Sequence, residues 1–79
     1  MDYDTDKIND AVLALLMLAT HREGEHGARA WKGHDWEVLN RLHEKGYIGD
    51  PISKAKSVLV TPEGLAKGRE LFARLFSRT

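Results

Sequence analysis

The second half of the chain combines helix and strand signals in an order that leaves few folds open. A helix is expected from about Trp36 to Lys45, because Asp35 can cap its first turn and Gly46 supplies the left-handed residue that ends many helices. The segment from Ser57 to Val60 is rich in β-branched side chains and predicts a strand. Another helix signal follows it directly, so the chain is expected to mix α and β structure.

The carboxy-terminal helix has clear start signals. Thr61 can cap its first turn, and Pro62 fits its first position, where the missing amide hydrogen breaks no helical hydrogen bond. Gly68 interrupts the helix and either marks the close approach of another backbone or is simply tolerated. The apolar stripe of this helix comprises Leu65, Leu71, Phe72, Leu75 and Phe76.

Between these two helices the sequence predicts a β-hairpin. Tyr47 and Ile48 are expected to enter a short strand that pairs with the segment from Ser57 to Val60 after a turn containing glycine and proline. Lys54 and Lys56 alternate along the extended chain and therefore point the same way. They either contact a phosphate backbone or protect an exposed strand edge from aggregation.

The first helix is expected to begin after a cap at Thr5 and to reach about Arg22. Leu13 and Met17 fall opposite its core stripe, so the helix needs a cover on both sides. The carboxy-terminal helix or a partner molecule would supply the second cover. The expected core stripe comprises Ile8, Ala11, Val12, Leu15, Leu16 and Ala19.

The stretch from His21 to His34 has no clear periodicity, and its glycines predict a loop with room for one short helical turn from Ala28 to Lys32. Trp31 and Trp36 lie five residues apart at its end. Burial is expected for them, because a small domain needs large apolar anchors. The alternative is that Trp31, flanked by basic residues, stacks on a base, a sugar or a partner's arginine.

Composition predicts one small soluble domain spanning residues 1–79, with no cysteine and hence no disulfide. Net charge is zero, with two basic and six acidic side chains up to Gly27 and ten basic and six acidic from Ala28 onward. This balance permits nucleic-acid binding without requiring it. The acidic amino terminus and the short apolar run from Ala11 to Ala19 predict neither a secretory signal nor a membrane span, so a cytoplasmic location is expected.

No catalytic signature stands out, and neither an enzyme nor a bound cofactor is expected. The chain has no glycine-rich phosphate loop after a strand and no serine or cysteine nucleophile motif. The segment from His21 to His26 contains several potential metal ligands, but their spacing matches no zinc motif and no cysteine completes a site. A solvated polar loop without metal is the expected outcome.

Residues suited to nucleic acid fall on three segments. Asn40 and Arg41 are the types that read adenine and guanine edges, and they lie on the exposed side of the helix that ends at Lys45. Glu37 and Glu44 on the same helix would repel phosphates. The predicted nucleic-acid-binding residues are Asn40, Arg41, Lys45, Lys54, Lys56, Arg29 and Lys32.

The order of elements from Asp35 to Phe72 resembles the second half of a winged helix-turn-helix domain, as in regulators of the multidrug-resistance and phenolic-acid types. The resemblance implies a mainly α fold with a small β-hairpin (α+β), winged-helix-like, with three or four helices and a two-stranded wing. The second helix of such domains is poorly matched by the glycine-rich stretch from Gly24 to Gly33.

A second resemblance covers nearly the whole chain. The residues that carry it are Arg29 to Gly33, Asp35 and Trp36, Arg41 to Gly46, Lys54 to Ser57, and Thr61 to Leu65. In these residues the chain is similar to a small bacterial domain family of unknown function, which implies a compact stand-alone domain and transfers no activity.

Two functions are compatible with these features. The first is a transcription-regulator-like protein that binds double-stranded DNA as a homodimer, which the winged-helix resemblance implies. The alternative is a protein-interaction or dimerisation module on the same fold that does not bind DNA, favoured by the zero net charge and the surplus apolar residues. A homodimer is expected in both, because an interface would supplement a small core. The predicted interface residues are Leu13, Met17, Phe72 and Phe76.

Overall fold

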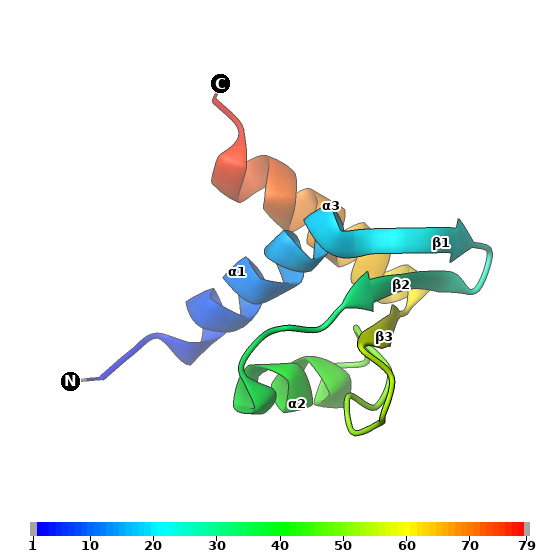
Figure 1. The fold of residues 1–79 in the computed structure, drawn as a ribbon. Coiled ribbons are helices and arrows are strands. Elements are labelled where there is room, and N and C mark those ends of the chain that lie inside the picture. Colours follow the sequence, from blue (N-terminus) through cyan, green and yellow to red (C-terminus); the bar gives the residue numbers. More distant parts are fainter. Residues whose placement is uncertain (1, 79) are drawn as a thin grey trace.

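This computed structural model describes residues 2–78 of the chain. They contain three α-helices and a three-stranded antiparallel sheet (Figure 1). The expected mixture of α and β structure is confirmed. The strand order is β1-β2-β3, so the central strand pairs on both sides. In chain order the elements are α1 (Thr5–Leu16), the 3₁₀ turn η1 (Met17–Ala19), β1 (Thr20–Gly24), β2 (Gly27–Trp31), α2 (Trp36–Glu44), β3 (Ser57–Val60) and α3 (Pro62–Phe76).

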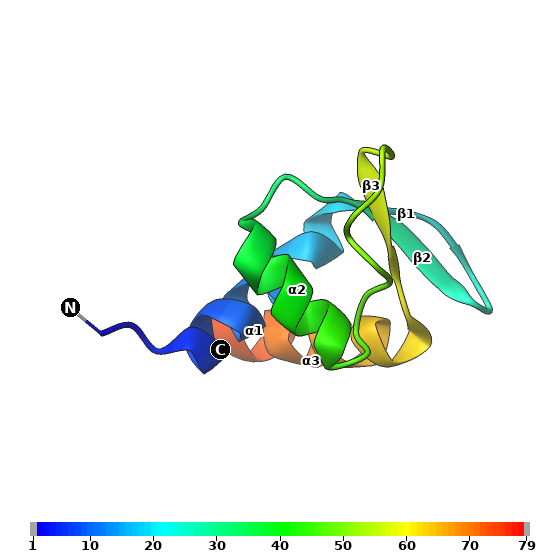
Figure 2. The same cartoon turned by 90° about the horizontal axis from the view of Figure 1, so that it is seen from below.

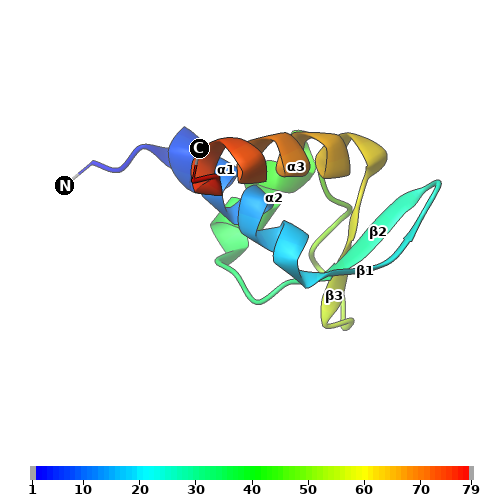
Figure 3. The same cartoon turned by 90° about the horizontal axis from the view of Figure 1, so that it is seen from above.

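The helices cover one face of the sheet and leave the other open. Helices α1 and α3 lie side by side, and the β1–β2 hairpin projects beyond them (Figures 2 and 3). Side chains alternate across the sheet: Ala28 and Ala30 of β2 and Val58 and Val60 of β3 are buried in the core, whereas Trp31 is exposed. The core therefore lies between the inner face of β2 and β3 and the three helices.

Helix α1 is shorter than predicted. Its cap is Asp4 rather than Thr5, because the Asp4 side chain accepts a hydrogen bond from the backbone amide of Lys7 at 3.0 Å. After Leu16 the backbone tightens into η1 and then becomes extended, so the prediction of helix to about Arg22 is wrong. Residues 20–24 form a strand that pairs with β2. The apolar periodicity of the helix does not predict where the helix ends and this strand begins.

The buried face of α1 differs from the predicted one, although Leu16 and the partly buried Val12 belong to both. Leu13, which the pattern placed outside, is 1% exposed and packs in the core with Leu16. Ile8 and Leu15, which the pattern placed inside, are exposed. The helix carries large apolar residues around most of its circumference, so the 3.6-residue period alone does not select the side that packs against α3.

The predicted loop from His21 to His34 contains a β-hairpin, and the segment from Ala28 to Lys32 holds most of a strand instead of a helical turn. Gly27 closes the hairpin with φ 117°, and a Cβ there would lie 2.1 Å from the carbonyl oxygen of Val60. Strand β1 is interrupted by a bulge, where Arg22 adopts φ 53°. The sequence does not signal this hairpin, because β1 contains one β-branched residue and β2 contains none.

The predicted two-stranded wing does not form, and β3 pairs along its length with β2. In this pair Ala28 lies opposite Val60 and Ala30 lies opposite Val58. The other predicted wing strand keeps a single bridge, between Ile48 and Val60. Residues 2–78 also contain no fourth α-helix.

The signals that bound α2 and α3 are confirmed to within one residue. Asp35 caps α2 with a hydrogen bond to its first turn, and Gly46 adopts φ 80° just after it. The Oγ1 atom of Thr61 accepts a hydrogen bond from the amide of Gly64 at 3.0 Å, and Pro62 opens α3. These caps depend on local chemistry, which is why the sequence predicts them well.

Two glycines of α3 allow close packing, in different ways. A Cβ at Gly64 would lie 1.9 Å from the carbonyl oxygen of Tyr47, so this glycine lets the two backbones meet. A Cβ at Gly68 would lie 2.7 Å from the sulfur of Met17, so the predicted close approach there is made by a side chain and not by a backbone. Gly64 is therefore the less replaceable residue, because a backbone carbonyl cannot rotate away.

We expect Gly64→Ala to lower the free energy of unfolding by about 2–4 kcal/mol, because the methyl group forces the start of α3 away from Tyr47. Urea denaturation followed by circular dichroism measures the loss. Gly33→Ala is the matched control, since a Cβ there meets nothing within 4 Å and the change should stay below about 1 kcal/mol. Equal denaturation midpoints for the two variants would contradict the close-approach argument.

Candidate functional site

Arg41, predicted to read a guanine edge, is hydrogen-bonded to a residue of α1. Its Nε atom donates a hydrogen bond to Oδ1 of Asn9 at 2.8 Å, and Asn9 is 2% exposed. The bond links α2 to α1 and satisfies a polar side chain in an otherwise apolar core. Arg41 is half-buried and is therefore poorly placed for a DNA groove.

Arg29 and Lys32 also serve the fold. The guanidinium of Arg29 donates through Nε and Nη2 to the hydroxyl of Ser57 at 3.1 and 2.9 Å, and through Nη2 to its carbonyl oxygen at 2.8 Å. The Nζ atom of Lys32 donates to the carbonyl oxygens of Pro51 and Ser53 at 2.8 and 3.2 Å. Arg29 thus fastens β2 to β3, and Lys32 holds the loop that leads into β3.

The other predicted nucleic-acid residues are exposed. Asn40 and Lys45 lie on or just after α2, and Lys54 and Lys56 lie in the bent loop before β3 rather than on the expected extended strand. Within residues 2–78, no carboxylate lies within ion-pair distance of these three lysines. The three lysine charges are therefore available to solvent or to a ligand.

Both tryptophans are exposed, so the prediction of burial is wrong. Trp31 is 56% exposed and Trp36 is 53% exposed. Trp31 stacks on His21 with ring centroids 4.5 Å apart, and Lys32 Nζ lies 5.6 Å from the ring centroid of Trp36. The alanines of β2 and the leucines of α1 and α2 fill the core in their place.

Helix α1 and the following turn η1 carry an uncovered apolar surface, here called the α1 stripe: Ile8, Leu15 and Leu18. Leu15 is seven residues after Ile8, and Leu18 follows it by three, so the three side chains project on one side of the chain. Leu18, in η1, is 71% exposed. The sequence carries the signal for this stripe, because apolar residues occur on both sides of α1, but only packing shows which side stays open.

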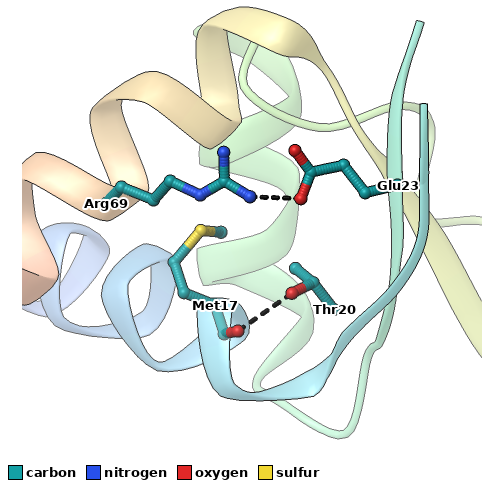
Figure 4. A network of polar contacts seen from close by, with 4 residues as sticks. All are labelled: Met17, Thr20, Glu23 and Arg69. Atoms are coloured by element: carbon teal, nitrogen blue, oxygen red, sulfur yellow. Dashed lines mark hydrogen bonds and ion pairs between the residues drawn. The ribbon is translucent and has the colours of Figure 1, made fainter. Parts of the chain in front are cut away.

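A hollow lies between η1 and α3 and continues from the α1 stripe, because Leu18 belongs to both. The hollow measures about 290 Å³. The side chain of Met17 lies against Gly68, and the ion pair between Arg69 and Glu23 crosses from α3 to β1 beside it (Figure 4). The residues that line this hollow, here called the α3 hollow, are Met17, Leu18, Thr20, Arg69, Phe72 and Ala73.

Three of the four predicted interface residues are brought together at this place. Met17 and Phe72 line the α3 hollow, and Phe76 packs edge-to-face on Phe72 with ring centroids 5.2 Å apart. Phe76 is exposed. Leu13 is the exception, because it lies on the side of α1 that faces the core. It is buried there and offers no surface to a partner.

No group of three or more histidine, cysteine, aspartate or glutamate side chains within residues 2–78 is arranged to hold a metal ion. In the same part of the chain, no helix has the length and apolar character needed to cross a membrane.

Comparison with known proteins assigns the chain to a family. Residues 4–78 match the model of a domain of unknown function, DUF6429, and the chain belongs to this family. It is similar to the uncharacterised protein y4hR of Sinorhizobium fredii (strain NBRC 101917 / NGR234), with 55% identity over 78 residues that cover 99% of this chain and 100% of that protein. No solved structure matches the chain. The predicted resemblance to a domain family of unknown function is thereby confirmed.

The structural role of Arg41 can be separated from any binding role. We expect Arg41→Met to lower the free energy of unfolding by about 1–3 kcal/mol, because it leaves the buried Oδ1 of Asn9 without its donor. Thermal and urea denaturation measure the change. Asn40→Ala, next to it on the exposed side of α2, should change the free energy by less than about 0.5 kcal/mol. An equal loss in both variants would show that the bond to Asn9 contributes little.

Proposed function

We propose that this protein is a self-associating interaction module that works as a homodimer through α1 and α3. The observation that supports this most directly is the α1 stripe, which runs into the α3 hollow. A chain of 79 residues has a small core. Self-association would bury the apolar surface on α1 and α3 and so add to the apolar area that stabilises the protein.

The shape of this surface fits a two-fold interface. Leu18 and Phe76 project as exposed apolar side chains, and Met17, Phe72 and Ala73 form a recess beside them. In a two-fold dimer the same surface meets itself, so the projecting residues of one protomer can enter the recess of its partner. An exposed aromatic residue next to an apolar recess is a common anchor at such interfaces.

The size and charge of the surface are also compatible with a dimer. A standard interface of about 800 Å² per partner would cover roughly a seventh of the 5519 Å² of accessible surface. The ion pair between Arg69 and Glu23 lies at the edge of the α3 hollow, where a polar rim would surround the apolar centre. With zero net charge, the protomers have no strong overall repulsion to overcome.

The test is to place a charge at the centre of the surface. The wild type is expected to be dimeric at about 100 µM, and Leu18→Glu is expected to be monomeric with an unchanged circular dichroism spectrum, because burying an unpaired carboxylate is costly. Sedimentation velocity measures the two states. Ile52→Glu is the matched control, since Ile52 is 73% exposed against 71% for Leu18 and lies in the loop before β3. A monomeric wild type, or a dimeric Leu18→Glu variant, would refute the proposal.

A second candidate function is binding of double-stranded DNA by a winged-helix-like surface. It is supported by Lys45, Lys54 and Lys56, which are exposed and have no carboxylate partner within residues 2–78. Asn40 is exposed on the same helix that precedes Lys45 and is of the type that pairs with adenine. Because Arg41 is hydrogen-bonded to Asn9, this surface would contact phosphates and read few base edges.

If this second function holds, the wild type should bind a mixed-sequence duplex at low salt and lose affinity steeply as salt rises. The double variant Lys54→Glu and Lys56→Glu should weaken binding by at least about tenfold, because it reverses two charges that face solvent. Fluorescence anisotropy of a labelled duplex measures the change. Lys67→Glu on α3 is the control and should bind as the wild type does. Absence of any salt-sensitive binding by the wild type would exclude this function.

A further inference from the structure

The open face of the sheet carries a separate group of side chains, here called the outer sheet face: His21, Arg29, Trp31 and Leu59. Arg29 pairs with His21 on one side and with Leu59 on the other, so the three residues form a row across the sheet. Trp31 follows Arg29 by two positions and therefore points to the same side. Leu59 and Trp31 are exposed, and the helices lie on the opposite side (Figures 2 and 3).

The aromatic part of this face is held in place. Trp31 stacks on His21 at an interplanar angle of 26°, and the Nδ1 atom of His21 lies 3.2 Å from the carbonyl oxygen of Ala19. Histidine covers part of one indole face, yet the indole remains 56% exposed. A large flat ring is thus presented to solvent on a strand that is hydrogen-bonded to its neighbours on both sides.

The cationic part of the outer sheet face is Arg29, which lies two positions before Trp31 on β2. Ser57 accepts the hydrogen bonds from Nε and Nη2 of Arg29, and Nη1 has no protein partner within residues 2–78. The side chain is therefore oriented while part of its fork stays available. Arg29 also lines a second hollow of about 500 Å³ together with Arg22, Glu25, His26 and Leu59. Glu25 lies 3.6 Å from His26, and Arg22 has no carboxylate within ion-pair distance in the same range.

We propose that the outer sheet face binds single-stranded nucleic acid, with Trp31 stacking on a base and Arg29 and Arg22 contacting the phosphates along the strand. Trp31 and Arg29 are two residues apart on β2, so their positions differ by about 7 Å along the strand. A flat aromatic ring beside cationic side chains is an arrangement that single-strand binding surfaces use, since every base offers a π face. Sequence preference would be weak, because stacking and phosphate contact do not read base edges.

A single strand fits this face better than a duplex does. In a duplex the bases are stacked on one another, so Trp31 could not reach a base face without unpairing it. The residues suited to a duplex lie elsewhere, on α2 and the loop before β3. The site is also separate from the α1 stripe and the α3 hollow, so this inference does not depend on the homodimer.

The experiment measures fluorescence anisotropy of a labelled oligothymidine of about 12 nucleotides at several salt concentrations. The wild type should bind, and Trp31→Ala should weaken binding by about tenfold or more. Trp36→Ala is the matched control, because Trp36 is 53% exposed against 56% for Trp31 and lies on α2, and its affinity should stay within about twofold. Both side chains are exposed, so neither change should unfold the protein.

Arg22→Asn tests the phosphate contact. Asparagine tolerates the positive φ of 53° at this position, so the bulge should persist while one charge is removed. The slope of log K against log salt should fall by about 0.7. The proposal is overturned if the wild type does not bind, if both tryptophan variants lose affinity equally, or if an unlabelled duplex competes as well as an unlabelled single strand. Leu18→Glu, assayed alongside, should bind per protomer as the wild type does, whatever its oligomeric state.

Discussion

Strand β2 is the element on which the rest of the structure depends. It is hydrogen-bonded to β1 on one side and to β3 on the other, and its small side chains, Ala28 and Ala30, are buried beneath the helices. Strand β3 pairs along its length with β2, whereas the segment around Ile48 makes a single bridge to the other edge of β3, and the long loop before β3 has no strand structure. The same alternation that directs the alanines inward directs Trp31 outward. The alternation of side chains along β2 therefore determines both the packing of the core and the residues on the open face of the sheet.

Local chemistry explains what the sequence predicts correctly. The side chains of Asp35 and Thr61 accept hydrogen bonds from amides within their own first turns, and Gly46 adopts a conformation that suits glycine. Each signal acts over three or four residues and does not need the rest of the fold. Part of the site at α3 is predictable for the same reason, because Phe72 and Phe76 are four residues apart and must lie on the same side of a helix.

Tertiary packing explains what the sequence does not predict. Helix α1 has apolar residues on two sides, and contact with α3 selects the side with Leu13. The guanidinium of Arg41 has the chemistry to read a base, but the buried amide of Asn9, thirty-two positions earlier, is its partner. Trp31 has the apolar area for a core, but the pleat of β2 places it outside. In each case a distant contact decides between two locally acceptable outcomes.

The bulge in β1 has a consequence for how copies of this chain can meet. An edge strand with unpaired amides and carbonyls is a template on which another chain can add, and such growth has no natural end. The edge strand β1 is five residues long and its register breaks between His21 and Gly24, so it offers no continuous row of backbone groups. Edge-to-edge addition of another chain at β1 is thereby discouraged, so that contact between copies on this side of the sheet would depend on side chains.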